Sequence, residues 1–153
     1  MSDFLEVENV ELQKDKILVL DFGSQYTQLI ARKLREIGIY CEIYAHDVSK
    51  QEFEVFAPKG VILSGGPDSA TEENRLDIPE FLFTSNVPLL GICYGMQAMA
   101  KQLGGKVIKS AQKEFGFAKV EIHAESKLLE SILDLSKDES SLDVWMSHGD
   151  AVI

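Results

Sequence analysis

Short apolar runs alternate with helical patterns along most of this chain, and no other feature of the sequence limits its fold as strongly. Four apolar runs have the length of strands: 16–22, 40–44, 60–64 and 88–92. The stretches between them repeat apolar residues at helical spacing, most clearly in 25–37 and 94–103. A repeated order of strand and helix is typical of a parallel sheet that is covered by helices. We therefore predict an α/β fold with an open, mostly parallel sheet and helices on both faces.

Residues with strong local preferences mark the ends of the predicted helices. Ser24 is expected to be the N-cap of the helix 25–37, and Gly38 is expected to end that helix as a C′ residue. Ser49 and Glu52 have the spacing of a capping box, which predicts a short helix after Ser49. These signals place each helix after a strand, as the alternating fold requires.

The later part of the chain is less regular. Residues 118–123 alternate apolar and polar side chains, as a strand with one solvated face does. Residues 143–146 are expected to form a last strand, and 147–150 a loop behind it. We interpret 1–15 as an N-terminal extension and 16–153 as one domain. Because the chain closes on the apolar residues Ala-Val-Ile, this domain is expected to be incomplete.

Composition excludes several classes of protein. The chain has 25 acidic and 15 basic residues, a formal net charge of -10, so nucleic-acid binding is not expected. Its two cysteines, Cys41 and Cys93, are too few for a disulfide framework, and no Cys/His spacing is typical of a metal site. No run has the pattern of a signal peptide or the length of a membrane span. These features predict a cytoplasmic protein without a metal site or a membrane partner.

The segment Gly91-Ile-Cys-Tyr-Gly95 is the sharpest candidate for chemistry, because it lies between a predicted strand and a predicted helix. The pattern Gly-x-nucleophile-x-Gly is a nucleophile elbow, a strained turn that lifts its side chain above the carboxyl end of the sheet. The helix N-terminus is expected to favour the thiolate of Cys93. The backbone N–H of Tyr94 is expected to stabilise an oxyanion. The alternative is an ordinary buried thiol between two incidental glycines.

A pair of glycines, Gly65 and Gly66, ends the neighbouring predicted strand. Glycine at such a position lets the backbone approach a ligand closely, and its N–H is a candidate for a second oxyanion donor. The alternative is a plain turn before Pro67. With the elbow beside it, the pair leaves both interpretations open.

Acyl chemistry at a thiolate needs a base, usually a histidine that an acid orients. The chain has 3 histidines. His46 follows a predicted strand and is expected at the surface, whereas His123 is expected on the solvated face of its own strand. His148 lies in a predicted loop after a strand end. From the residues alone, His148 and Asp150 are therefore the candidate base and its orienting acid.

The elbow is part of Gly91-Ile-Cys-Tyr-Gly-Met-Gln97, a run that closely resembles the class I glutamine amidotransferases. Five further segments are informative: Asp21-Phe-Gly-Ser-Gln-Tyr-Thr-Gln-Leu-Ile30, Ile62-Leu-Ser-Gly-Gly-Pro67, Glu72-Glu-Asn74, Glu114-Phe-Gly116 and Asp143-Val-Trp-Met-Ser-His-Gly-Asp150. These segments resemble one branch of that family, the glutamine-hydrolysing GMP synthases, and they occur in the family's order. Several motifs in register are far more specific than any one of them.

The resemblance implies roles for individual residues. Cys93 would attack the side-chain amide carbon of glutamine, and the backbone N–H groups of Gly66 and Tyr94 would form the oxyanion hole. Ammonia would leave, and water would hydrolyse the γ-glutamyl thioester to glutamate. The residues that the resemblance assigns to glutamine binding are Gln97, Ser147, His148 and Gly149.

The same resemblance changes the interpretation of His148. In the family, the histidine and the glutamate of the catalytic triad lie in a His-Pro-Glu run near the end of the domain, and no such run occurs in these 153 residues. His148 therefore matches the glutamine-binding loop rather than the base. We expect this chain alone to have little or no glutaminase activity.

In whole enzymes of this branch, an ATP-pyrophosphatase domain activates xanthosine monophosphate with ATP and magnesium, and the ammonia converts it to GMP. The resemblance therefore implies glutamine as the ligand, this synthetase domain as the partner, and no cofactor in the present residues themselves. No ATP-pyrophosphatase or dimerisation domain is expected in the chain. The whole enzyme is expected to be a homodimer of purine nucleotide biosynthesis.

Two other classes stay open. One is another Cys-elbow enzyme on the same architecture, such as a peptidase or a chaperone-like hydrolase. The other is a binding module that keeps the glutamine pocket without catalysis. A glutamine analogue that carries a reactive ketone separates them, because only the amidotransferase would be labelled at Cys93 and protected by glutamine.

Overall fold

The computed structural model describes residues 15–66, 76–124, 127–129 and 141–152. The chain divides into two compact units, one that runs to Ile108 and one that spans Lys109–Ala151. The predicted N-terminal extension, 1–15, lies outside the described residues except for Asp15. Within the described residues, no helix has the length and apolar character needed to cross a membrane.

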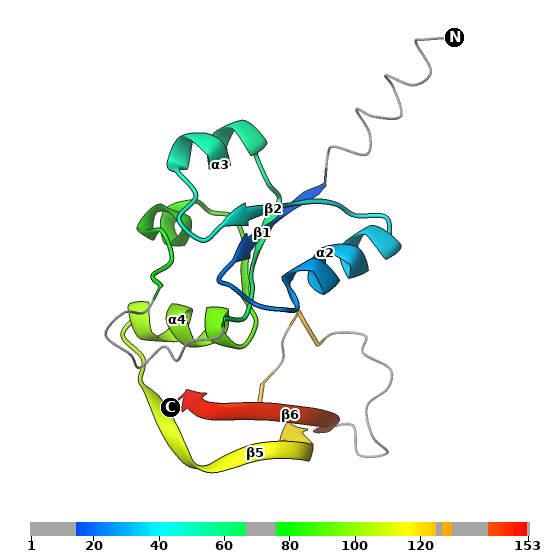
Figure 1. Cartoon of the computed structure of the whole chain (residues 1–153), viewed down its shortest axis with the longest axis vertical. Helices are drawn as coiled ribbons and strands as arrows, with labels where there is room; N and C mark the ends of the chain where they lie inside the picture. The colour runs from blue at the N-terminus through cyan, green and yellow to red at the C-terminus, as the bar shows by residue number, and fades with distance from the viewer. Residues whose placement is uncertain (1–14, 67–75, 125–126, 130–140, 153) are drawn as a thin grey trace. The chain divides into compact units, whose positions relative to one another are not determined.

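The first unit follows the alternating order that the sequence predicts (Figure 1). Its strands are β1 (Lys16–Asp21), β2 (Tyr40–Ala45), β3 (Gly60–Leu63) and β4 (Leu89–Gly91). Its helices are α2 (Thr27–Glu36), α3 (Lys50–Phe56), the short 3-10 helix η1 (Glu80–Thr84) and α4 (Tyr94–Gln102). Neighbouring strands are parallel, in the order β2-β1-β3-β4. The predicted parallel α/β fold is confirmed.

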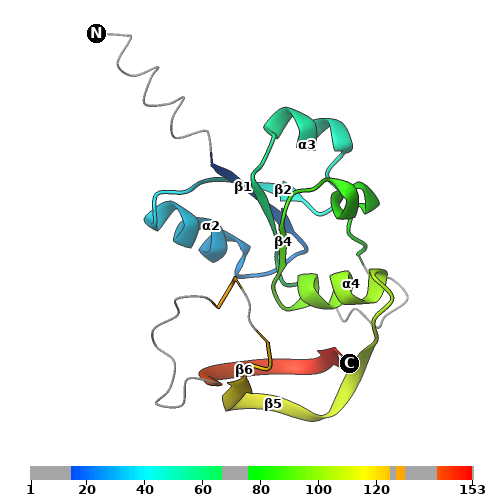
Figure 2. The ribbon, with the colours of Figure 1, turned by 180° about the vertical axis from the view of Figure 1, so that it is seen from behind.

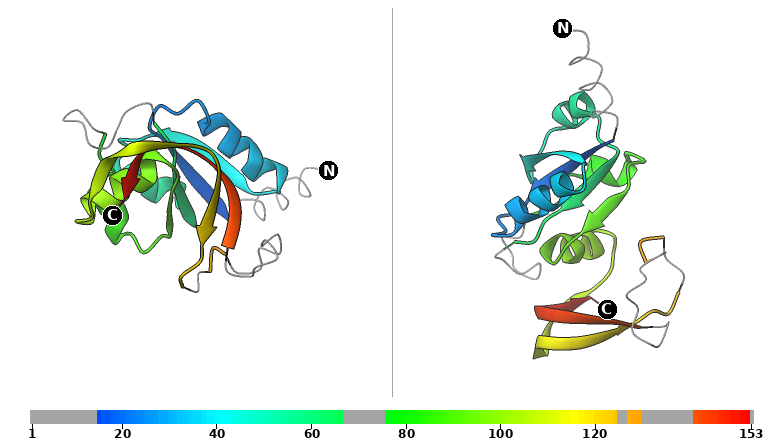
Figure 3. Two further views of the ribbon diagram at one scale, coloured as in Figure 1. Left: turned by 90° about the horizontal axis from the view of Figure 1, so that it is seen from below. Right: turned by 90° about the vertical axis from the view of Figure 1, so that its right-hand side faces the viewer.

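Alternate residues of β1 enter two separate cores. Leu18 and Leu20 are fully buried with side chains of α3, η1 and α4, whereas Val19 is fully buried with side chains of α2 and β2. β3 divides in the same way, with Leu63 in the first core and Ile62 in the second. Figure 2 shows α2 and α4 on opposite sides of the strands, and the left-hand view of Figure 3 shows the same separation from below. Because both faces of the sheet are covered, its inner strands are apolar along their length.

The predicted helix ends are confirmed at the start of α3 and at the end of α2, but not at the start of α2. Ser49 accepts a bond from the Glu52 N–H (3.2 Å), and the Glu52 carboxylate accepts one from the Ser49 N–H (2.9 Å), which is a complete capping box. Gly38 follows α2 with a left-handed φ of 82°. Ser24 is not the N-cap, because its hydroxyl accepts a bond from the Tyr26 N–H (3.0 Å) in a turn, and Tyr26 is the N-cap.

The second sheet has two strands, β5 (Val107–Glu121) and β6 (Ser141–Val152). Both are longer than predicted: β5 begins well before residue 118, and β6 continues through 147–150, where the sequence predicted a loop. Serine, glycine and aspartate favour turns by their local chemistry. Pairing with a long partner strand overrides that preference here.

Candidate active site

Cys93 occupies the turn between β4 and α4, as the elbow pattern predicts. Its φ of 51° and ψ of -112° belong to a conformation that is rare for residues with a side chain and accessible to glycine. Two backbone bonds close the turn: the Ile92 N–H donates to Leu63 O (2.9 Å), and the Gly95 N–H donates to Ile92 O (3.0 Å). The strain therefore falls on the residue that carries the thiol, as is common at functional sites.

The two glycines of the elbow are required because the neighbouring backbone leaves no room for a Cβ. A Cβ at Gly91 would lie 2.6 Å from the backbone N of Met96, and a Cβ at Gly95 would lie 2.5 Å from Leu63 O, closer than real Cβ atoms come to other atoms. These approaches bring the first turn of α4 onto the ends of β3 and β4. The predicted close passage of the backbone beside the nucleophile is confirmed.

The glycine pair at the end of β3 lies beside Cys93. A Cβ at Gly65 would lie 3.5 Å from the Cys93 Cβ and 3.3 Å from Ser24 Oγ, so the carboxyl ends of three strands meet at this point. Gly66 has a different reason to be small, because a Cβ there would lie 2.9 Å from Phe22 O. The sequence predicted that the glycine pair lies beside the elbow, but it did not identify Ser24 as a neighbour of Gly65.

The first turn of α4 is held by side chains that point into the protein. Tyr94 is 3% exposed, and its hydroxyl accepts a bond from the Leu76 N–H (2.7 Å) and donates one to Leu76 O (2.8 Å). Gln97 is 6% exposed, and its backbone N–H donates to Cys93 O (3.1 Å). Two residues with predicted roles, Tyr94 and Gln97, are thus fixed within one helical turn of Cys93.

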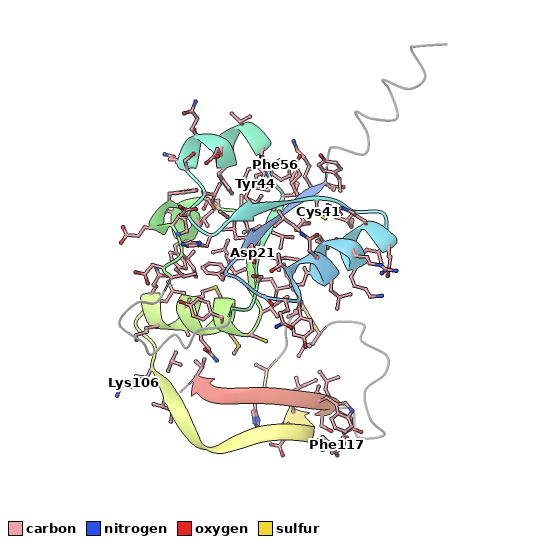
Figure 4. All side chains as sticks on the ribbon, in the orientation of Figure 1. Asp21, Cys41, Tyr44, Phe56, Lys106 and Phe117 are labelled. Atoms are coloured by element: carbon pink, nitrogen blue, oxygen red, sulfur yellow. The ribbon has the colours of Figure 1, made fainter. Side chains whose placement is uncertain are left out.

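The two cysteines lie in different surroundings. Cys93 is exposed, whereas Cys41 is 2% exposed and its Sγ donates to Ala31 O (3.4 Å) between β2 and α2 (Figure 4). Partial burial raises the pKa of the Cys93 thiol above its ordinary value. The sequence predicted the opposite direction from the helix N-terminus alone, because it does not show how far the thiol is desolvated. At neutral pH the thiol form of Cys93 therefore prevails.

Alkylation of Cys93 by iodoacetamide is accordingly expected to accelerate with pH well beyond neutrality. The thiolate is the reacting species, and a raised pKa places its half-titration above the ordinary value of about 8.5. The rate is measured by mass spectrometry of the Cys93 peptide across neutral and alkaline pH, with the buried Cys41 as an internal control. A rate that reaches its plateau at or below neutral pH would contradict the raised pKa.

The candidate histidines of the sequence lie in unequal environments. His46 is half-buried rather than at the surface, because its ring packs on Phe22 with the ring centroids 5.6 Å apart. The His123 side chain is 83% exposed, as predicted, and lies 3.6 Å from the Glu121 carboxylate. His123 is not part of a strand, however, because β5 ends at Glu121. Among the described residues, no three His, Cys, Asp or Glu side chains form a group that could hold a metal ion.

The segment predicted to hold glutamine, Ser147-His148-Gly149, lies in β6 in the second unit. Asp150, the candidate orienting acid, lies in the same strand. The glutamine-binding role of the segment and the alternative role of His148 as a base both stay predictions.

Ser64 is a residue of this site that the sequence did not single out. It is fully buried between β3 and the glycine pair. Its N–H donates to Leu20 O (3.0 Å), and its hydroxyl accepts from the Phe22 N–H (3.0 Å) and donates to Gly65 O (2.8 Å). In the sequence, a serine at the end of an apolar strand is a weak signal of such a role. It indicates that a buried hydroxyl needs hydrogen-bond partners, but it does not show which groups those partners are.

Comparison with known proteins places these residues in a family. The sequence model of the family Glutamine amidotransferase class-I matches residues 18–153. A GMP synthase [glutamine-hydrolyzing] of Shewanella loihica is 59% identical over 140 residues, which cover 90% of this chain and 27% of that protein. The corresponding protein of Yersinia enterocolitica is 57% identical over 143 residues, with 92% and 27% covered. The chain thus spans 27% of the length of these curated relatives.

Two solved structures are similar to the chain. One is a protein of Thermoplasma acidophilum that is assigned to a GMP synthase; it has a TM-score of 0.76 and 32% identity over 91% of this chain and 67% of its own. The other is a glutamine amido transferase from Methylobacillus flagellatus, with a TM-score of 0.62 and 20% identity over 92% of this chain and 57% of its own. The second likeness supports the fold alone, and both agree with the parallel α/β arrangement.

Proposed function

The chain belongs to the class I glutamine amidotransferase family, and from this membership we propose that Cys93 is the nucleophile that takes ammonia from glutamine. The observation that carries the proposal is an exposed thiol in a strained turn at the start of α4, beside the glycine pair that ends β3. An elbow at this edge of a parallel sheet is suited to attack on a carbonyl carbon.

In the proposed reaction, the Cys93 thiolate attacks the side-chain amide carbon of glutamine. The backbone N–H groups of Gly66 and Tyr94 stabilise the oxyanion that forms. Collapse of this intermediate breaks the C–N bond, and the leaving nitrogen becomes ammonia by taking a proton from the triad histidine, which the family carries in its His-Pro-Glu run and these 153 residues lack. Water then attacks the thioester, which releases glutamate and restores the thiol. Glutamine and water are thereby converted to glutamate and ammonia.

Glutamine itself is proposed to be held by Gln97 and by the backbone of Ser147, His148 and Gly149. The place of Gln97 one turn after the nucleophile supports its part in this set, because Cys93 is the N-cap of the helix that carries Gln97. The part of the β6 segment rests on the family resemblance.

The ammonia is proposed to serve a nucleotide synthetase. The curated relatives are named as glutamine-hydrolysing GMP synthases, and this chain matches 27% of their length. An ATP-pyrophosphatase domain that uses ATP and magnesium would then be the partner, and xanthosine monophosphate would be aminated to GMP by a homodimeric enzyme. Neither Cys41 nor Cys93 forms a disulfide, which fits a reducing compartment such as the cytoplasm.

A polypeptide of these 153 residues is expected to show little or no steady-state glutaminase activity. The reason is chemical: the thiol of Cys93 has a raised pKa, and the family's His-Pro-Glu run, which supplies the base, does not occur in the sequence. Ammonia release from glutamine measures the activity. Turnover near that of an intact amidotransferase, lost in His148→Ala, would identify His148 as the base instead.

Labelling by a glutamine analogue that carries a reactive ketone tests the proposed nucleophile directly. We expect Cys93 to be modified, excess glutamine to slow the modification, and Cys93→Ala to remain unlabelled. Modification that glutamine does not slow would favour another Cys-elbow hydrolase. Glutamine binding without any labelling would favour a non-catalytic module.

A further inference from the structure

We propose that the buried hydroxyl of Ser64 positions the oxyanion hole, by fixing the orientation of the peptide between Gly65 and Gly66. The inference rests on the proposed function and deepens it. Ser64 is a positioning residue in this scheme, because it acts through the glycine peptide and through α4 rather than on glutamine.

Ser64 lies where the ladder between β1 and β3 ends. Its N–H donates to Leu20 O (3.0 Å), as a regular parallel ladder requires. The next bond of such a ladder would run from the Phe22 N–H to the Ser64 carbonyl. The Phe22 N–H instead donates to Ser64 Oγ (3.0 Å), and the Ser64 carbonyl accepts from the Gly95 N–H of α4 (3.1 Å). The Ser64 hydroxyl thus takes the place of the Ser64 carbonyl in the ladder. The carbonyl is left to accept the bond from the first turn of α4.

The proton of the same hydroxyl fixes the glycine peptide. Ser64 Oγ donates to Gly65 O (2.8 Å), and Ser64 is fully buried, so the Gly65 carbonyl is directed into the interior. In a planar trans peptide, the C=O and the following N–H point in opposite directions. The Gly66 N–H therefore points away from the Ser64 hydroxyl, and in the proposed reaction this N–H donates to the oxyanion.

A flipped peptide would reverse this arrangement. It would turn the Gly65 carbonyl oxygen toward the side that Gly66 N–H now faces, where a negative oxygen would be repelled rather than stabilised. It would also leave the only proton of a buried hydroxyl without its acceptor, which opposes the flip. Through its carbonyl, Ser64 also holds the turn that carries Cys93 and Tyr94. Ser64 thus fixes the positions of the nucleophile and of the two proposed oxyanion donors relative to one another.

The test compares two reagents that differ in their need for an oxyanion hole. The γ-aldehyde analogue of glutamine adds reversibly to the Cys93 thiolate: a C–S bond forms, the carbonyl electron pair moves to oxygen, and the oxygen becomes an anion or takes up a proton from water. Iodoacetamide reacts by displacement of iodide and forms no oxyanion. Aldehyde affinity is measured in the 153-residue chain as protection of Cys93 from iodoacetamide, and glutamine affinity is measured in the same way.

Ser64→Ala is expected to weaken aldehyde affinity at least about 10-fold, because the oxyanion donor is no longer held in place. The iodoacetamide rate and the glutamine affinity are expected to change less than about 2-fold, since neither depends on an oxyanion. Ser64→Cys, a near-isosteric variant with a weak donor, is expected to weaken aldehyde affinity as well and serves if the alanine variant does not fold.

Thr27→Val is the matched control. Thr27 is 2% exposed, and its hydroxyl donates to the Asp21 carboxylate (2.7 Å) at the end of β1, so the variant also loses a hydroxyl bond, one that is partly buried (Figure 4 labels Asp21). Its aldehyde affinity is expected to match the wild type. Unchanged aldehyde affinity in a folded Ser64 variant, or an equal loss in Thr27→Val, would overturn the inference while leaving the proposed function intact. If neither aldehyde nor glutamine protects the wild-type chain, the proposed function fails, and the inference fails with it.

Discussion

Replacing Gly95 by alanine is expected to lower the free energy of unfolding by about 3 kcal/mol or more. The new methyl group would lie 2.5 Å from Leu63 O and 2.6 Å from the Leu63 Cβ. Leu63 is fully buried and paired with Leu20 in the sheet, so it has no free space to move into. The clash is relieved only if α4 moves off β3, which breaks the bond from the Gly95 N–H to Ser64 O (3.1 Å). Urea unfolding followed by circular dichroism measures the loss.

Gly104→Ala, just after the same helix, separates this steric effect from the general effect of replacing a glycine. No described atom lies within 4 Å of a Cβ at Gly104, and only its φ of 91° opposes a side chain. A loss of about 1–2 kcal/mol is expected there. Equal stability of the two variants would show that α4 adapts to the methyl group at little cost.

Much of the fold was predictable because a strand that is buried on both faces is a continuous apolar run, and such a run is visible in the sequence. Leu18, Val19 and Leu20 are all fully buried, so three apolar residues in succession are required in β1. The segment 147–150 contains no such apolar run. Its place in β6 depends on a partner strand distant in sequence, whereas its residues by themselves favour a turn.

The candidate site was predictable where geometry restricts residue type. Gly91 and Gly95 are required by contacts under 3 Å with neighbouring backbone, so the elbow is visible as a pattern. The part of Ser64 was not visible, because the partners of a buried hydroxyl are set by the ends of two other elements. The direction of the Cys93 pKa also depends on which atoms desolvate the thiol, and the sequence shows only the helix that follows it.

Cys93→Gly is expected to abolish labelling by thiol reagents and, at the same time, to unfold less readily than Cys93→Ala. Both variants remove the thiol, but only glycine adopts a φ of 51° with a ψ of -112° without strain. Strain of this kind amounts to about 1–3 kcal/mol, and the greater chain entropy of an unfolded glycine offsets up to about 1 kcal/mol of it. We therefore expect Cys93→Gly to be the more stable variant by about 1 kcal/mol, as measured by urea unfolding of the pair.

Ala57 offers the control for this comparison, because it has a φ of 50° at the C-cap of α3, away from the elbow. Ala57→Gly should also stabilise the fold, since it relieves a positive φ, but it should leave the labelling of Cys93 unchanged. If Cys93→Ala were as stable as Cys93→Gly while Ala57→Gly gained stability, the turn at Cys93 would relax once the thiol is gone. If both glycine variants gain stability, the surrounding backbone imposes the strained turn at residue 93. The cysteine side chain then lowers the free energy of unfolding of the native protein.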